Sequence, residues 1–421
     1  MKQFQTIYRR KNSLVIWLKQ IFSYCEEKNI PKDRLLFRIF SDSTVKERVE
    51  EVVEIIREAV PEAAYAGTTS TGNIVFGSLV DAHVSVTCTV YEACDAKMAI
   101  LQFPMDRDTQ ASSAERLIKA VEERPWVKAV EIMTTLSTLN MEALCSTLSE
   151  LPENILVYGG AAHTTDMKNG DSSQTFVFSS AGSIACHNAV FILLGGDSLS
   201  VITRYLIGWK QLGHALSVTE VDGNFLKSVN NIPARSFYEK YLGIQKGKDF
   251  FRMNNVFPLG FRSEGIPYLR IVTDYPDDGS LRLSSYVKHD VSRCAITYGS
   301  PMEINNKLRT NLKALSEFAP EVIQLFSCAA RLIFWGADNV SHETLPFSVL
   351  AQTGGYYTAG ELLRCGREVL LHNIALVIVG LREGEPDRIP EVPRINDVEL
   401  SRQMRVSNCL ANFIEAMTEE K

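Results

Sequence analysis

The sequence predicts an α/β (α+β) protein whose mixed, largely antiparallel sheets are flanked by helices. Buried strand patterns alternate with amphipathic helix patterns along most of the chain, which is typical of packed layers of both kinds of element. The order strand, helix, strand, turn, strand returns three times, so internally repeated units are expected. Between the second and third units, residues 257–298 have the pattern of antiparallel strands, with a hairpin turn at residues 275–280.

The first unit begins with an apolar run over residues 35–40, which predicts a buried strand. Residues 45–60 then place apolar side chains on one face and charged side chains on the other, which predicts an amphipathic helix. A short strand over residues 63–66 follows. It leads into a turn that lies between Gly67 and Gly72.

Two later segments repeat this pattern. The second unit is expected over residues 129–194 and the third over residues 322–379. In the third unit, Gly355 and Gly360 bracket four residues, like the glycine pair of the first unit, and each second glycine is followed by a polar and then an apolar residue. The sequence therefore predicts three related α/β units.

Two segments lie outside the repeats. Prolines among charged residues predict an extended linker after the third unit. The last segment has apolar side chains along one face of a predicted helix, which is typical of a helix that dimerises or passes a signal onward. Because this apolar face is short, a helix that packs back against the rest of the protein is equally expected. The predicted segments are a helix over residues 1–29, domains over 30–242 and 243–382, a linker over 383–396 and a helix over 397–421.

Composition and charge argue against several classes of partner. The chain has 44 Lys and Arg residues and 50 Asp and Glu residues, which gives a net charge of −6. This charge provides no overall electrostatic attraction to nucleic acid or to an acidic membrane. Its apolar runs are far shorter than the ~20 residues that span a bilayer. The nine cysteines are scattered without a Cys-x-x-Cys pair, which is typical of reduced thiols in a cytoplasm, and no metal is expected.

The first candidate site is the corner over residues 327–331, where the strand of the third unit gives way to a helix. Backbone N–H groups and the positive helix end are expected there, where α/β sheets bind ligands. Arg331 lies one helical turn after Cys328, and its guanidinium suits a carboxylate or a phosphate. The alternative is that Cys328 is a small buried hydrophobe and that Arg331 forms a structural ion pair.

The second candidate site is the glycine-rich loop over residues 355–361. It lacks both Gly-x-Gly-x-x-Gly and the Gly-Lys-Ser/Thr ending of a phosphate loop, so nucleotide binding is weakly supported. Its glycines let the backbone approach a ligand closely, and Tyr357 and Glu361 offer stacking and hydrogen bonding. A tight turn between strands is the structural alternative.

Cysteine and histidine residues allow two further hypotheses. Cys328 and His372 would form a thiolate pair for nucleophilic catalysis. His372, however, begins a strand that recurs in the repeat units, so a structural hydrogen-bonding role is the simpler interpretation. His163 and His214 are lone histidines of the kind that can bind a haem iron, but the sequence has no Cys-x-x-Cys-His attachment. A thiol enzyme and a haem-based sensor therefore stay open as alternatives.

Four stretches of the chain carry a resemblance to a known family. They read GTTSTGNI at residues 67–74, QLFSCAAR at 324–331, GYYTAGEL at 355–362 and LHN at 371–373. With these motifs the sequence resembles the FIST family, a prokaryotic sensory module with N-terminal and C-terminal halves. The resemblance covers roughly residues 31–381.

The resemblance implies a cytoplasmic sensor of amino acids or similar metabolites. Such modules precede output domains such as GGDEF diguanylate cyclases, histidine kinases or chemoreceptor signalling regions, and some members resemble haem-dependent nitric oxide sensors. Thr68 and Asn73 replace the Cys and Glu of the family's N-terminal turn, which weakens a ligand role there, whereas the C-terminal half keeps Gly360 and Glu361. The last helix, residues 397–420, would serve a homodimer or contact the output domain or partner.

We therefore predict a non-enzymatic sensor with no resident cofactor; a haem-based nitric oxide sensor and a Cys328 thiol enzyme are the alternatives. Arg331 is expected to hold a ligand carboxylate, Glu361 to meet its amino group and Tyr357 to wall the pocket. The predicted ligand-binding residues are Cys328, Arg331, Tyr357, Gly360, Glu361 and His372.

Overall fold

The fold is the mixed α+β arrangement that the sequence predicts. The computed structural model describes residues 1–42, 45–136, 139–164, 175–247, 250–288 and 290–395, together with Cys409 and Ile414. Within these residues, three six-stranded sheets and one eight-stranded sheet contain mostly antiparallel neighbours. Every helix in this described part is too short or too polar to cross a membrane.

The three six-stranded sheets share one strand pattern. Each has a central parallel pair, an antiparallel strand and an edge strand on one side, and a hairpin on the other. The first sheet has the order β1 (Lys2–Ile7), β6 (Val84–Val90), β2 (Leu35–Ser41), β3 (Ala64–Thr69), β10 (Val177–Ser179), β11 (Gly182–Ala185). The second has β7 (Lys97–Pro104), β12 (Asn188–Gly195), β8 (Val127–Thr134), β9 (Leu156–Ala161), β24 (Glu361–Cys365), β25 (Glu368–His372). The third has β13 (Leu199–Leu206), β26 (Leu376–Glu383), β22 (Val322–Cys328), β23 (Gln352–Thr358), β4 (Asn73–Val75), β5 (Ser78–Val80).

The hairpin at the end of each sheet comes from a different repeat unit. The β10–β11 hairpin of the second unit completes the first sheet, and the β24–β25 hairpin of the third unit completes the second sheet. The β4–β5 hairpin of the first unit completes the third sheet. This cyclic exchange pairs a strand edge that each unit would otherwise expose, so the three units interlock.

A glycine occupies the same position in each parallel strand pair. Gly67, Gly159 and Gly355 are the register partners of Ile39, Ile132 and Leu325 respectively. A Cβ atom on these glycines would lie 2.4, 2.0 and 1.9 Å from the carbonyl oxygen of the partner. Because no other residue fits so close an approach, the glycine recurs in the sequence.

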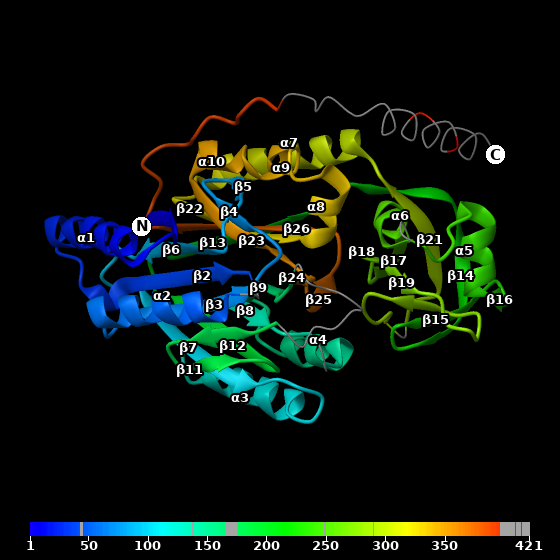
Figure 1. The fold of residues 1–421 in the computed structure, drawn as a ribbon, viewed down its shortest axis with the longest axis horizontal. Coiled ribbons are helices and arrows are strands. Elements are labelled where there is room, and N and C mark those ends of the chain that lie inside the picture. The colour runs from blue at the N-terminus through cyan, green and yellow to red at the C-terminus, as the bar shows by residue number, and fades with distance from the viewer. Residues whose placement is uncertain are drawn as a thin grey trace.

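Helices cover the outer faces of the three sheets, and the inner faces meet in one core (Figure 1). Phe40, Met133 and Phe326, from the central strands of the three units, belong to this inner core. The η1 turn (Lys32–Arg34) precedes β2. The covering helices are α1 (Lys11–Lys28) and α2 (Lys46–Ala59) on the first sheet, α3 (Gln110–Glu122) and α4 (Met141–Ser149) on the second, and α7 (Pro301–Phe318), α8 (Ala329–Trp335), α9 (Ser341–Thr344) and α10 (Phe347–Leu350) on the third.

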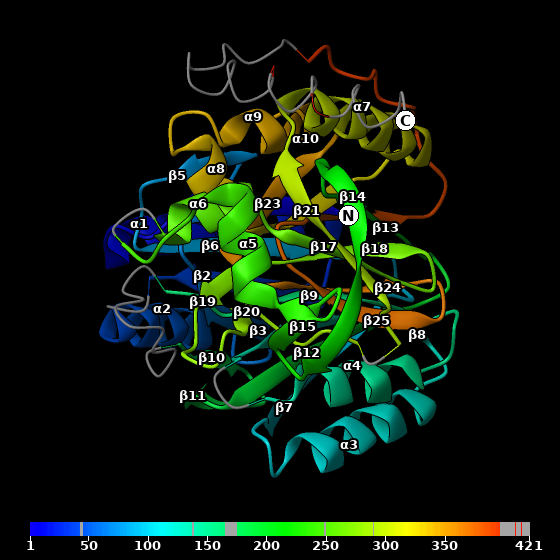
Figure 2. The ribbon, with the colours of Figure 1, turned by 90° about the vertical axis from the view of Figure 1, so that its right-hand side faces the viewer.

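Residues 209–299, here called the insert, lie to one side of the three sheets (Figure 1) and face the viewer in Figure 2. The insert has its own core, and its residues Trp209, Leu269, Ile271 and Tyr286 pack into the cores of the second and third sheets. It contains the antiparallel strands predicted over residues 257–298. Its strands are β14 (Trp209–Asp222), β15 (Phe225–Val229), β16 (Ile232–Pro233), β17 (Leu259–Ser263), β18 (Ile266–Arg270), β19 (Val272–Asp274), β20 (Leu281–Leu283) and β21 (Arg293–Gly299), and its helices are α5 (Ala234–Leu242) and α6 (Phe250–Val256).

The segment boundaries differ from the sequence prediction in two places. The first residues of the predicted helix over 1–29 form strand β1, because they pair with β6 along their whole length, and α1 begins only at Lys11. The predicted boundary at 242/243 falls inside the insert, directly after α5. Residues 384–395 of the predicted linker form neither helix nor strand, and the predicted helix over 397–421 lies outside the described residues apart from Cys409 and Ile414.

Candidate functional site

Cys328 lies at the corner between a central strand and a helix, as the sequence predicts. Strand β22 ends at Cys328, whose N–H donates to the carbonyl oxygen of Ala375 (2.9 Å), and α8 begins at the next residue. The residue is 3% exposed, and burial, with the carboxyl of Glu361 nearby, raises the pKa of its thiol well above the ordinary value. A buried neutral thiol is the form that a nucleophilic cysteine must avoid.

Arg331 is fully buried and forms an ion pair inside the protein. Its Nε donates to Glu343 Oε2 (2.6 Å) and its Nη2 donates to Glu343 Oε1 (2.7 Å). Its Nη1 donates to the carbonyl oxygens of Ile207 (2.9 Å) and Ile374 (2.7 Å), and the indole N–H of Trp335 also donates to Glu343. The structural ion pair, one of the two interpretations of the sequence, is what the structure contains, so the guanidinium is already occupied by a protein carboxylate.

Glu361 follows a tight turn that contains Gly360, and its carboxyl is fully buried. The carboxyl accepts hydrogen bonds from the Thr358 hydroxyl and from the N–H of Ala375 (3.1 Å). Burial is the largest influence and raises the pKa of Glu361 from 4.5 to about 8, although these hydrogen bonds and the Cys328 thiol act in the opposite direction. The group is therefore mostly protonated at neutral pH.

Tyr357 and His372 are also fully buried. The Tyr357 N–H donates to the carbonyl oxygen of Gly72 (2.9 Å), where the hairpin of the first unit joins the third sheet. His372 is the register partner of Glu361 in the β24–β25 hairpin, and its Nε2 lies 3.7 Å from the Sγ of Cys365. Burial, together with the charge of a nearby arginine, lowers the pKa of His372 to about 3, so the ring is neutral.

The structure thus brings four of the predicted residues into one buried cluster: Cys328, Gly360, Glu361 and His372. Arg331 and Tyr357 lie beside it toward α8 and α9, where the charges of Arg331 and Glu343 act on the Tyr357 hydroxyl. All six residues are buried. Side chains buried to this extent do not present an open binding surface of their own.

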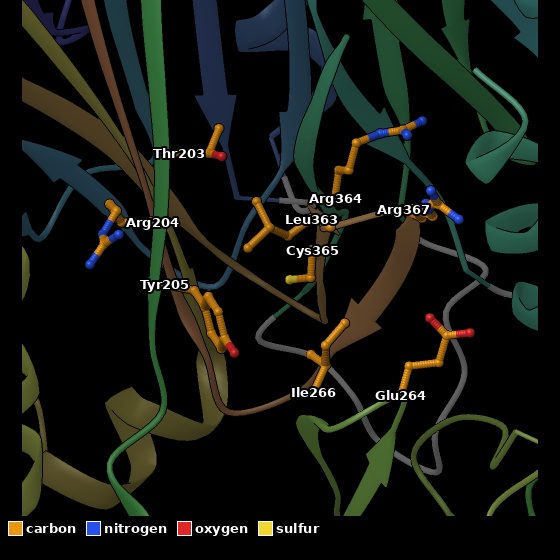
Figure 3. A pocket seen from close by; sticks show the side chains of 10 residues that line it. Thr203, Arg204, Tyr205, Glu264, Ile266, Leu363, Arg364, Cys365 and Arg367 are labelled. Carbon is orange, nitrogen blue, oxygen red and sulfur yellow. The ribbon is translucent and has the colours of Figure 1, made fainter. Parts of the chain in front are cut away.

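An open pocket of about 560 Å³ lies next to this cluster, between the insert and the sheets. Its walls come from β13, from the β24–β25 hairpin and from the β17–β18 hairpin of the insert (Figure 3). A volume of this size is typical of small-ligand sites. Its lining residues are Thr203, Arg204, Tyr205, Glu264, Ile266, Leu363, Arg364, Cys365, Gly366 and Arg367.

The side chains of Tyr205, Ile266 and Cys365 converge in the pocket, whereas those of Arg204 and Arg364 point away from it (Figure 3). The Nε of Arg204 donates a hydrogen bond to the side-chain oxygen of Asn311 on α7 (3.3 Å). The Nη2 of Arg364 donates to two backbone carbonyl oxygens at the end of α4 (3.0 and 3.1 Å). The side chains that converge in the pocket thus present an aromatic ring, an aliphatic chain and two polar groups, the Cys365 thiol and the Tyr205 hydroxyl. Burial raises the pKa of both groups, that of Cys365 to about 12.

Two residues of opposite charge line the same side of the pocket. Glu264 comes from the insert and Arg367 from the turn of the β24–β25 hairpin (Figure 3). The side chain of Arg367 is 81% exposed and pairs with the exposed Glu153 at 3.0 Å. Exposed pairs of this kind contribute little energy, so the guanidinium can exchange partners readily.

The sequence predictions missed the pocket residues Tyr205, Glu264, Ile266, Cys365 and Arg367. The sequence does contain a signal for two short turns near these residues: a glycine follows Glu264, and another glycine precedes Arg367. These turns are far apart in the chain and belong to different sheets. Only the docking of the insert against the β24–β25 hairpin brings them together.

Comparisons with known proteins agree with the resemblance seen in the motifs. The model of the FIST N domain matches residues 35–232, and that of the FIST C domain matches residues 234–364. No curated protein matches the chain in sequence. A crystal structure of cyanuric acid hydrolase from A. caulinodans aligns over 91% of this chain and 99% of its own, with 8% identity and a TM-score of 0.32, too low to indicate a shared fold.

The two domain matches together run from β2 into β24, include the insert, and end before β25 and β26 of the third unit. FIST domains are sensory domains of signal transduction, and the family is not one of enzymes. The chain therefore belongs to the FIST family of sensory domains.

Proposed function

We propose that this chain is a sensory module that binds an amino acid or a similar small metabolite in the pocket between the insert and the sheets. The single observation that carries the proposal is that two side chains of opposite charge, Glu264 and Arg367, line one side of a pocket that is also lined by Tyr205 and Ile266. An amino acid needs opposite charges at its two ends and a separate surface for its side chain. This pocket offers both.

In this proposal Arg367 binds the ligand carboxylate and Glu264 binds the amino group. These roles replace those expected for Arg331 and Glu361, because Arg331 already holds Glu343 and the Glu361 carboxyl is mostly uncharged. Tyr205 takes the place expected for Tyr357 as the aromatic wall.

The buried cluster then has the role of responding to the ligand. Cys365 lines the pocket and contacts His372, which pairs across the hairpin with Glu361, and Glu361 lies close to Cys328 at the start of α8. A shift of the hairpin therefore reaches α8 through residues that neighbour one another in the fold. We propose that the response passes to an output domain or partner in the cytoplasm, such as a diguanylate cyclase or a histidine kinase.

A thermal-shift screen of the full chain against amino acids, dipeptides, nucleotides and haem tests the proposal. A ligand at 100 times its dissociation constant adds ~2.7 kcal/mol of stability. We expect a hit among the amino acids, with Arg367→Ala weakening its affinity about tenfold (~1.4 kcal/mol) and Arg309→Ala on α7, an exposed control, leaving it unchanged. A folded Arg367→Ala protein with wild-type affinity, or a screen without a hit among the amino acids, would contradict the proposal.

The same screen tests the haem alternative. The donors at the pocket are the His372 ring, which is fully buried, the Cys365 thiol, whose pKa is raised to about 12, and the Tyr205 phenol, whose pKa burial also raises. None of them is an accessible imidazole, a thiolate or a phenolate, the forms that bind haem iron, so this donor set does not fit haem. We expect no Soret band from protein expressed with added haem.

A further inference from the structure

We propose that the insert acts as a hinged lid over this pocket and that Glu368 is its latch. The inference rests on the proposed function, because it assigns a regulatory device to the same site. The insert supplies Glu264 and Ile266 to the pocket, and the sheets supply the opposite wall. A separation of the two bodies therefore opens the pocket.

Glu368 joins the two bodies at the edge of the pocket. It directly follows the pocket residue Arg367 and begins strand β25. Its carboxylate accepts a hydrogen bond from Ser263 of the insert (Oγ to Oε2, 3.0 Å) and forms an ion pair with Lys288 of the insert. The side chains of Lys288 and Glu368 are only 17% and 18% exposed, so solvent screens this pair less than a surface pair.

A second contact of the insert reaches the strand that carries His372. Arg270 is buried between two tyrosine rings, and its Nη1 donates to the carbonyl oxygen of Leu371 (3.1 Å) and to Asn373 Oδ1 (3.4 Å). Ser284 donates to the same Asn373 oxygen (2.9 Å). The two residues that flank His372 are thus both held by the insert, so a movement of the lid displaces the buried cluster.

The hinge is a narrow two-stranded connection. The insert begins at Trp209 and ends at Gly299, and these two residues are register partners at the ends of β14 and β21. Gly208, just before the insert, has a φ of +77°, a conformation that glycine adopts without strain. Arg331 donates to the carbonyl oxygen of Ile207 beside this glycine, which fixes the sheet side of the hinge.

Hydrogen exchange followed by mass spectrometry on the ligand-free full chain tests the latch independently of any ligand. Glu368→Gln removes the charge that holds Lys288 and keeps an oxygen for Ser263, so we expect exchange of the 259–270 and 361–372 hairpins to rise about tenfold. Asp274→Asn is the matched control, because it breaks an ion pair with Lys246 (2.7 Å) inside the insert, away from the pocket, and it should leave both hairpins unchanged. Unchanged exchange in Glu368→Gln, or a rise spread over the whole chain, would overturn the latch.

A second measurement separates the lid from the proposed function. Stopped-flow binding of the amino acid that scores highest in the thermal-shift screen should show faster association and faster dissociation in Glu368→Gln than in wild type, because the open state is more populated. Wild-type rates in the variant would refute the lid and leave the sensor intact. A screen without any binding amino acid would refute the sensor, and the exchange experiment would still decide the latch.

Discussion

Replacement of Arg331 by methionine separates the two roles that the sequence allows for this residue. The change keeps most of the side-chain volume and removes the guanidinium. Glu343 then keeps a buried carboxylate whose remaining partner is the Trp335 N–H, and the carbonyl oxygens of Ile207 and Ile374 each lose a charged donor. The substitution is therefore expected to act on stability.

The expected loss follows from the burial of the pair. Side-chain exposure is 0% for Arg331 and 1% for Glu343, so neither group is solvated in the folded chain. Removal of one member of such a pair costs about 3–5 kcal/mol, because the other charge stays buried without compensation. A typical protein is stable by about 5–15 kcal/mol, so Arg331→Met removes a large part of the total. The double variant Arg331→Met/Glu343→Leu should recover most of this loss.

Urea unfolding followed by circular dichroism measures these differences for the wild type and the single and double variants at one pH. We expect a lower midpoint for Arg331→Met with little change in slope, and a midpoint near the wild-type value for the double variant. An Arg331→Met protein as stable as the wild type that no longer binds the amino acid would refute this reasoning and restore the ligand-holding role of Arg331.

Two further predictions concern the buried cluster. Because the pKa of Glu361 is about 8 when folded and 4.5 otherwise, the folded chain keeps a proton that the unfolded chain releases, so Glu361 by itself lowers the free energy of unfolding as pH rises from about 4.5 to about 8, by at most ~1.4 kcal/mol per pH unit. His372, whose pKa is lowered to about 3 in the folded chain, acts in the opposite direction up to about pH 6.5. In urea titrations at several pH values, the difference in free energy of unfolding between wild type and Glu361→Gln should therefore fall with pH over this range, and a difference that does not change with pH would contradict the shift. Iodoacetamide with peptide mapping should label the exposed Cys94 and Cys186 first and the buried Cys328 last, with Cys365 between them. Labelling of Cys328 as fast as Cys94 would favour a reactive thiol.

Local sequence patterns predicted much of the fold. The amphipathic pattern over residues 45–60 matches α2, and the apolar run over residues 35–40 matches β2, because both periodicities follow from which face of the element is buried. The recurring glycine pairs marked the first and third units, and in the structure Gly67 and Gly355, like Gly159 of the second unit, each lie against a carbonyl oxygen of the neighbouring parallel strand. Strand β1 was missed because its partner, β6, is distant in the chain.

The candidate site was predictable only in part. The spacing of Cys328 and Arg331 placed both correctly at a strand–helix corner, but it left open which acid pairs with Arg331, and Glu343 supplies that acid from α9. For the glycine-rich loop the sequence left open a ligand-binding loop and a tight turn between strands. The structure has a tight turn, and Glu361 after it is buried between strands β9 and β25 of the second sheet.

The sequence by itself determined most of the element types, the three repeats, the glycines of the first and third units and the family. These properties depend on neighbouring residues or on motifs that are continuous in the chain. Only the tertiary structure decided that the hairpin of each unit pairs with the sheet of another unit and that Arg331 forms an ion pair inside the protein. It also decided that the insert packs beside β25 and that a pocket lies between them. These properties depend on contacts between segments far apart in the chain, where pairing, burial and charge compensation are settled by the whole fold and not by any local pattern.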